Sequence, residues 1–395
     1  EAFDLDEGGY LETIAAYRFP MHHTLFLAAA RVVSALVGEP YRGFVVLDML
    51  TSALALWATW WWLRGLVGRR TALAGTLVLA AAPVFWAYGA MAANYTAIPI
   101  VGSLLLGLAW RGHDQPRPWH PFAAAIALAL GAGYRQDIGT FWFPAFLVIL
   151  WQHRWIVAAQ ALLVCGIVNF AWLLPMLHDV GGWSAYREAS AEFAYKAGYL
   201  NSVWNVGLVD APLRYAVKGL IALVWTLGPA IIFAFRGAWR LPRMRAGRFL
   251  ALLLALSVVP ALASHLLVHF GVPGYVLHYV PALVALVALG IGPAKCVEAQ
   301  PCSEEVVDRK AALRLASLAA ILAAVFLAYP TNYNRAGLWG DFDLAFGRQT
   351  RIGLRTRPPM RDPGAWRTVN SQELPGATVR RARTPHRSVL DVLGN

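Results

Sequence analysis

The first residues of the chain carry three carboxylates within four positions. Asp4, Asp6 and Glu7 lie in a short polar stretch, EAFDLDEGG, ahead of a mostly apolar sequence. A positioned carboxylate can act as a general base toward an attacking hydroxyl or amine, and neighbouring carboxylates also suit hard divalent cations. The stretch therefore predicts a general base or a site for Mg²⁺ or Mn²⁺, and the simpler alternative is a solvated acidic loop.

A second candidate for chemistry is Arg135, in the segment GYRQDIG. The apolar runs on either side, 121–134 and 138–152, are too short to cross a hydrocarbon core of about 30 Å without tilt or thinning. We therefore expect the hairpin to lie below the membrane surface, where an arginine is costly and usually functional. Its planar guanidinium matches a phosphate group. A structural ion pair with Asp137 is the competing interpretation.

Further polar residues lie near the ends of predicted helices. His265 and His269 share one helix face, and His278 follows after a short turn. Zinc prefers such ligands, but no fourth ligand is evident, so we favour packed histidines at the membrane interface. Lys218 lies near the outer end of the predicted span 211–235 and could help to bind a phosphate. The alternative is a lysine that extends toward the interface.

The amino-acid composition of the chain indicates that these residues belong to a membrane protein. The chain is 58% hydrophobic and 14% charged, against about 25% charged in soluble domains. We expect an all-α polytopic membrane protein of about ten to twelve helices, with external juxtamembrane helices. Because the sequence begins with Glu1 rather than methionine, we also expect a helix ahead of it. The predicted spans are 43–63, 71–88, 94–110, 121–134, 138–152, 155–176, 211–235, 247–268, 275–292 and 311–329.

Lysine and arginine gather in alternate connections, which the positive-inside rule assigns to the cytoplasm. We therefore divide the chain into three predicted regions. These are an external acidic loop with a juxtamembrane or re-entrant helix (1–42), a transmembrane helical domain (43–329) and a small basic external tail (330–395). Within the domain, the external loop 178–210 is either a surface lid or a simple connector. For the first region, an ordinary span at 20–37 is the alternative. The net charge of +12 lies mostly in loops and tail, so no nucleic-acid partner is expected.

Four stretches of the sequence resemble the motifs of one family of membrane proteins. FDLDEGGYLE contains Asp6 and Glu7, and RFPMHHTLFLAAARVVSALVG follows it. GRRTALAGTLVLAAAPVFWAYGAMAANYTAIP ends near Asn94, and GVPGYVLHYVPALVALVALG contains Tyr275. Over residues 1–330 the chain resembles the GT-C superfamily of membrane glycosyltransferases, and is most similar to its protein mannosyltransferase and lipid A aminoarabinose transferase branch. Asn94 stands at the second-loop position, where many relatives carry an acid.

The resemblance implies a polyprenyl-phosphate sugar as donor and a lipid, protein or glycan acceptor. The active site would be on the external face of a bacterial inner membrane. Asp6, supported by Glu7 or Asp4, would activate the acceptor. Arg135, with Lys218 and the aromatic Tyr275, would bind the donor phosphate, and Asp137, His265 and His269 would support the site. The chain has no GxxxxGK[ST] nucleotide-binding motif, as expected for a lipid-linked donor.

Two other classes of function remain open. A membrane transporter or lipid flippase would show internal repeats and polar groups along a central path, and we find no convincing repeat. A catalytically degenerate family member is the third hypothesis, because Asn94 cannot carry the charge of an acid. Convergence of Asp6 and Arg135 on one external cavity would favour the enzyme.

Overall fold

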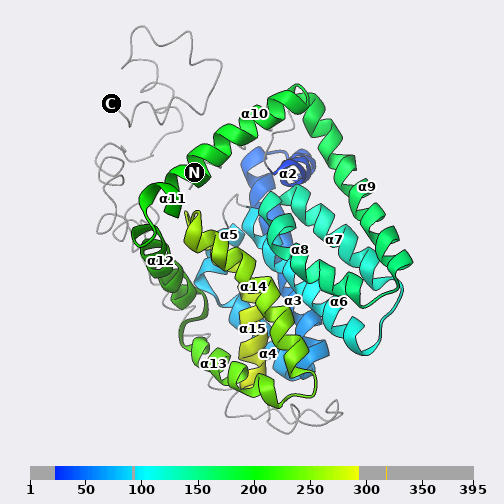
Figure 1. Cartoon of the computed structure of the whole chain (residues 1–395), viewed down its shortest axis with the longest axis vertical. Coiled ribbons are helices and arrows are strands. Elements are labelled where there is room, and N and C mark those ends of the chain that lie inside the picture. The colour runs from blue at the N-terminus through cyan, green and yellow to red at the C-terminus, as the bar shows by residue number, and fades with distance from the viewer. Residues whose placement is uncertain (1–22, 91–93, 293–316, 318–395) are drawn as a thin grey trace. The chain divides into compact units, whose positions relative to one another are not determined.

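The computed structural model describes residues 23–90, 94–292 and 317. Throughout these residues the secondary structure is helical, without strands. The prediction of an all-α protein is therefore confirmed (Figure 1). The helices are α2 (Thr24–Val37), α3 (Pro40–Val67), α4 (Arg69–Ala80), α5 (Pro83–Ala90), α6 (Ala97–Asp114), α7 (His120–Tyr134), α8 (Gln136–Trp151), α9 (Trp155–Val180), α10 (Trp183–Phe193), α11 (Val203–Val206), α12 (Asp210–Leu227), α13 (Ile231–Arg240), α14 (Gly247–Leu267) and α15 (Val280–Ile291), with short helical turns such as η1 (Asn94–Thr96) and η6 (Pro273–His278) between them.

Among the described residues, four helical segments are long and apolar enough to cross a membrane: α3, α9, α12 continued through α13 to Arg243, and α14. The pair α4 and α5, bent by 67° at a short break, would make a fifth. The helices α7, α8 and α15 are apolar but have only 15, 16 and 12 residues. The protein is thus an integral membrane protein. The predicted span 311–329 and the tail 330–395 lie outside the described residues, so the predicted total of ten to twelve helices stays a prediction.

The helix α2 packs against α3 and α7. It ends at Gly38, whose positive φ of 80° suits a residue without a side chain. Glu39 then caps α3 by accepting hydrogen bonds from the backbone of the next turn. Phe26 of α2 contacts Phe44 and Tyr134, with ring centroids 5.4 and 5.2 Å away. With 14 residues, α2 is roughly 21 Å long, and its place at the membrane surface stays a prediction.

The helices α13 and α15 cross with their backbones in close contact. A Cβ atom at Gly237 would overlap the carbonyl oxygen of Leu286, and one at Gly290 would overlap that of Phe233. Only glycine at both positions permits this approach. The Arg240 guanidinium of α13 donates to carbonyl oxygens at the end of α15, so α13 also caps its neighbour.

The helices have two chemically different ends. At one end, Arg111 of α6 donates to the Trp61 carbonyl of α3 at 2.8 Å, and Gln152 after α8 donates to Ala109 of α6 at 2.9 Å. The arginine-rich connections follow these helix ends. The α7–α8 junction, η1 and the α14–η6 connection lie at the opposite ends of the same helices. Most of the predicted site residues belong to this second end.

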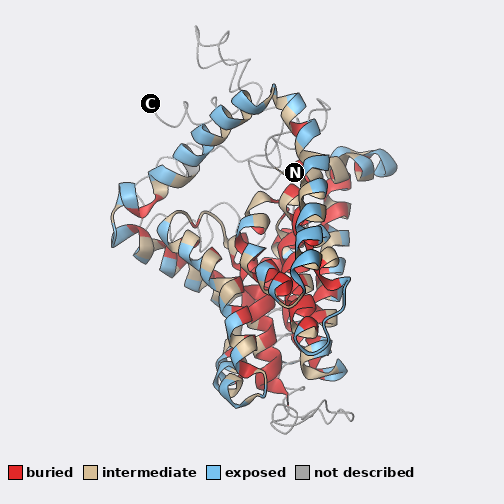
Figure 2. Ribbon diagram, turned by 45° about the vertical axis from the view of Figure 1, so that its right-hand side comes forward, coloured by how far each residue is buried: buried red, intermediate tan, exposed pale blue. Residues whose placement is uncertain are grey.

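The segment 178–210 contains α10. Figure 1 shows α10 between α9 and α11. None of its residues is buried, in contrast with the buried centre of the helix bundle in Figure 2. Trp183 and Tyr186 pack together on it, with ring centroids 5.6 Å apart. Its role as a lid or a connector stays open.

Candidate functional site

Arg135 is the single extended residue between α7 and α8. Its backbone has φ −154° and ψ 114°, and its N–H donates to the Gly131 carbonyl at 2.7 Å. Two short apolar helices therefore fold back on one another at a charged residue. The Arg135 residue is only 5% exposed, so its charge requires partners inside the protein.

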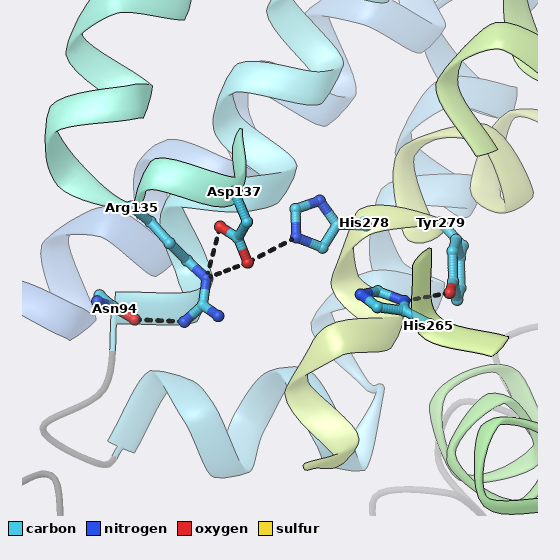
Figure 3. A network of polar contacts seen from close by, with 6 residues as sticks. All are labelled: Asn94, Arg135, Asp137, His265, His278 and Tyr279. Atoms are coloured by element: carbon cyan, nitrogen blue, oxygen red, sulfur yellow. Dashed lines mark hydrogen bonds and ion pairs between the residues drawn. The ribbon is translucent and has the colours of Figure 1, made fainter. Parts of the chain in front are cut away.

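Those partners come from three separate elements, α8, η1 and η6. The Nε atom of Arg135 donates to the Asp137 carboxylate at 2.9 Å, and Nη1 donates to Oδ1 of Asn94 at 2.7 Å (Figure 3). The guanidinium lies over the Tyr95 ring, 3.8 Å from its centroid, and 5.4 Å from that of Tyr275. The ion pair with Asp137 that the sequence left as an alternative is present.

Asp137 joins this pair to a buried histidine. It lies in the first turn of α8, where the positive end of the helix dipole favours a carboxylate. His278 of η6 is fully buried, and its Nε2 lies 3.3 Å from Oδ2 of Asp137. His278 donates its Nε2 hydrogen in this contact, because a carboxylate only accepts.

His265, near the end of α14, forms a second polar contact next to this network. Its Nδ1 is hydrogen-bonded to the Tyr279 hydroxyl, and its ring packs edge-on against Phe141 and tilted against Tyr275. The residue is 3% exposed. Among the residues that the structure describes, no three histidine, cysteine or carboxylate side chains could hold a metal ion. His265 is thus packed among aromatic rings.

Lys218 of α12 brings a second cationic group toward the same end of the helices. It is 3% exposed, and Tyr215 lies one turn before it. The Tyr215 ring is 6.2 Å from that of His269, which follows α14. Burial and the positive charges of Lys218 and Arg214 lower the pKa of His269 to about 4. Two cationic side chains therefore lie close enough to His269 to affect its titration.

A row of rings connects the two cationic groups. His269 lies 6.2 Å from Tyr275, and Tyr275 lies 5.8 Å from Tyr95, on which Arg135 is stacked. Lys218 and Arg135 thus stand at the two ends of a row of aromatic side chains drawn from α12, η6 and η1. Cations beside aromatic walls suit a ligand that has an anionic group and an apolar or sugar portion.

The structure brings together most of the predicted site and leaves one part aside. Asn94, Arg135, Asp137, His265, His269, Lys218 and Tyr275 all belong to this assembly of contacts. Asp4, Asp6 and Glu7 lie outside the described residues. Their predicted convergence with Arg135 stays a prediction.

Sequence reasoning missed Tyr95 and the role of His278. Tyr95 directly follows the second-loop position, and this proximity was the available signal. His278 was interpreted as an interfacial histidine. Its bond to Asp137 joins residues 141 positions apart, and nothing in the local pattern indicates it.

Comparison with known proteins gives one family match and two fold matches. Residues 22–178 match the family model of dolichyl-phosphate-mannose-protein mannosyltransferases. Two solved structures of ArnT from Cupriavidus metallidurans share the fold. One is bound to undecaprenyl phosphate, with TM-score 0.54 and 15% identity, and the other is in the apo state, with TM-score 0.52 and 16% identity. No curated protein sequence matches the chain.

The alignment with both ArnT structures covers 88% of this chain and 64% of theirs. The chain thus spans less than two thirds of the length of these relatives. The family model and the shared fold confirm the resemblance to the GT-C superfamily of membrane glycosyltransferases that the sequence predicted.

Proposed function

From this resemblance to the GT-C membrane glycosyltransferases, we propose that the protein moves a sugar from a polyprenyl-phosphate donor to an acceptor at the external membrane face. The acceptor class, whether lipid, protein or glycan, stays open. The observation that carries the proposal is the row of aromatic rings between Arg135 and Lys218. In support, one ArnT structure of the same fold is bound to undecaprenyl phosphate.

The two cationic groups would have different tasks. Asp137 neutralises Arg135, so this guanidinium contributes oriented N–H donors more than net charge. Lys218 and Arg214 lie near His269 on the α12 side. They would balance the charge that develops on the phosphate as the sugar leaves it, which is the role that preorganised cations have in transfer reactions. Tyr275, between the two groups, would line the donor site.

The acceptor would be activated by the N-terminal carboxylates. Asp6, supported by Glu7 or Asp4, would take the proton of the attacking group as the new bond to the sugar forms. These residues would also be the place for Mg²⁺ or Mn²⁺ if the protein uses one. The chemistry above needs no step through such an ion.

The proposed membrane orientation follows from the two ends of the helices. The arginine-rich connections are assigned to the cytoplasm by the positive-inside rule, so the Arg135 end would face outward. Because α7 and α8 have 15 and 16 residues, Arg135 would lie roughly 22 to 24 Å from their far ends. That is short of a core of about 30 Å, and it would bring the site close to the phosphate of a lipid donor. A bacterial inner membrane fits this arrangement.

The test is sugar transfer in proteoliposomes. The parent protein is supplied with a set of polyprenyl-phosphate sugars and candidate acceptors, and release of polyprenyl phosphate is measured. Lys218→Gln and Asp6→Asn are expected to lower the rate by roughly 100-fold or more, the usual effect of losing a preorganised charge or base. Asn169→Ala, which removes an amide on α9 bonded to Cys165, is the control and retains the parent rate.

Each outcome bears on the proposal. Equal turnover in parent and Asp6→Asn would remove that carboxylate from the chemistry. Absence of turnover in the folded parent with every donor would contradict the transferase. It would favour the transporter or the catalytically degenerate relative, and the two are then separated by measuring lipid flipping in the same vesicles.

A further inference from the structure

The side-chain amide of Asn94 has one satisfied and one unsatisfied end. The residue is 1% exposed, and its Oδ1 accepts a hydrogen bond from Nη1 of Arg135 at 2.7 Å. Its Nδ2 is buried and has no hydrogen-bond partner in the described part of the chain. Buried amide groups are nearly always satisfied, so an exception at a candidate site needs a physical reason.

Arg135 fixes which end of the amide is unsatisfied. A guanidinium has only donors, so the atom of Asn94 that faces it must be the acceptor Oδ1. The guanidinium cannot readily turn away, because Nε is held by Asp137 at 2.9 Å and its face lies on Tyr95. The Asn94 amide is therefore held in one orientation, and Nδ2 is directed away from Arg135.

What this position offers to a ligand is a neutral hydrogen-bond donor. A carboxylate at the same place would be ion-paired with Arg135 and would offer a further acceptor for a cation or a hydroxyl. An unmatched buried N–H destabilises the structure, and a ligand oxygen that accepts from it removes this cost. Phosphate oxygens are strong acceptors, so a phosphate group matches this donor.

We propose that Asn94 donates a hydrogen bond from Nδ2 to a phosphate oxygen of the bound polyprenyl-phosphate lipid, and that Arg135 is the positioning residue that holds the amide in this orientation. The inference rests on the proposed function, since it assigns a contact within the same donor site. It also implies that the second-loop position binds the phosphate directly, without a divalent cation between the two.

The experiment measures binding of undecaprenyl phosphate to the purified full chain in detergent micelles, by the rise in thermal stability and by equilibrium titration. Asn94→Ala is expected to lose roughly tenfold or more in affinity, as for a hydrogen bond to a charged group. Asn94→Asp keeps the shape and the contact with Arg135 but turns the donor into a negative acceptor. It is expected to bind more weakly than Asn94→Ala in EDTA, and to regain affinity when Mg²⁺ is added. The affinity of the parent is expected to be the same in EDTA and in Mg²⁺.

The source of the phosphate is tested in a second arm. Inorganic phosphate at millimolar concentration is expected to leave the melting temperature of the parent unchanged, since it lacks the lipid tail. An equal effect of inorganic phosphate and lipid would overturn the assignment to a lipid headgroup. Asn169→Ala serves as the matched amide control and is expected to bind like the parent.

Failure of this inference is distinct from failure of the proposed function. If the parent binds the lipid and both Asn94 variants bind equally well, Nδ2 does not contact the phosphate and the inference is wrong. If parent binding requires Mg²⁺, the direct contact is wrong. If the folded parent does not bind undecaprenyl phosphate at all, the proposed donor site is wrong as well. Because Asn94→Asp preserves the ion-paired core, the test remains decisive if Asn94→Ala does not fold.

Discussion

Removing the charge of Asp137 should destabilise the protein through Arg135. The two side chains are 22% and 6% exposed and are joined at 2.9 Å. Removing one partner of a buried ion pair costs about 3 to 5 kcal/mol, because the other charge stays buried. In Asp137→Asn the amide oxygen still accepts from Nε, and Asn94 keeps its bond to Nη1. We therefore expect the lower part of that range, about 3 kcal/mol.

A double-mutant cycle measures the interaction itself. Asp137→Asn, Arg135→Gln and the double variant are unfolded by SDS titration in mixed micelles. The double variant is expected to be more stable than the sum of the single losses predicts, by about 2 kcal/mol, because it leaves no unpaired charge. Asp114→Asn, at the exposed end of α6, is the control and should change stability by less than about 0.5 kcal/mol. Additive losses within about 0.5 kcal/mol would refute the coupling.

Three other variants probe the packing and charge around the site. Gly274→Ala places a Cβ atom 2.6 Å from the Tyr95 ring, so we expect displacement of the ring under Arg135 and weaker binding of undecaprenyl phosphate in titration. Gly290→Ala meets the backbone carbonyl of Phe233 and should cost about 3 kcal/mol in SDS unfolding, the upper part of the usual overpacking range. His269 has a folded pKa of about 4, against about 6.5 unfolded. Because the unfolded chain binds the extra proton first, stability should fall as pH drops from about 6.5 to 4. In His269→Gln that part of the pH profile should be absent.

Matched control variants separate these specific effects from a general loss of stability on mutation. Gly166→Ala on α9 meets no atom within 4 Å and should not lower stability. His178→Gln removes a histidine whose side chain is 90% exposed, and it should change stability by less than about 0.5 kcal/mol. A Gly290→Ala protein as stable as Gly166→Ala would contradict the close crossing of α13 and α15. An unchanged pH profile in His269→Gln would contradict the burial of that imidazole beside two cations.

The helical architecture and part of the site could be predicted because their signals are local. Apolar runs identify helices, and two short runs around GYRQDIG indicate a hairpin with Arg135 at its turn. The pair Arg135 and Asp137 is two positions apart, so it could be named from the sequence alone. Two apolar runs that were predicted as single spans contain helix breaks, because glycine and proline interrupt a helix even where the run is apolar. The run 71–88 bends before Pro83, and the run 211–235 is interrupted at Gly228 and the proline that follows.

The rest depends on contacts between distant parts of the chain. The bond from Arg135 to Asn94 spans 41 positions, and the bond from His278 to Asp137 spans 141. No periodicity in one sequence indicates which of several histidines reaches a given carboxylate. The resemblance showed that Asn94 replaces the acid that many relatives carry. It could not show which way the Asn94 amide points, because that orientation depends on the neighbouring side chain that fixes it.

The arrangement of charges gives the two ends of the ring row different physical roles. Arg135 is compensated by Asp137, so it adds direction without much net charge, and it holds the Asn94 donor in place. Lys218 is buried near His269 and Arg214, and burial together with the charges of Lys218 and Arg214 lowers the pKa of His269. A bound phosphate would interact favourably with these two cations. Affinity for the charge should therefore come mainly from the α12 side, whereas orientation of the phosphate should come from the side of η1 and the α7–α8 junction.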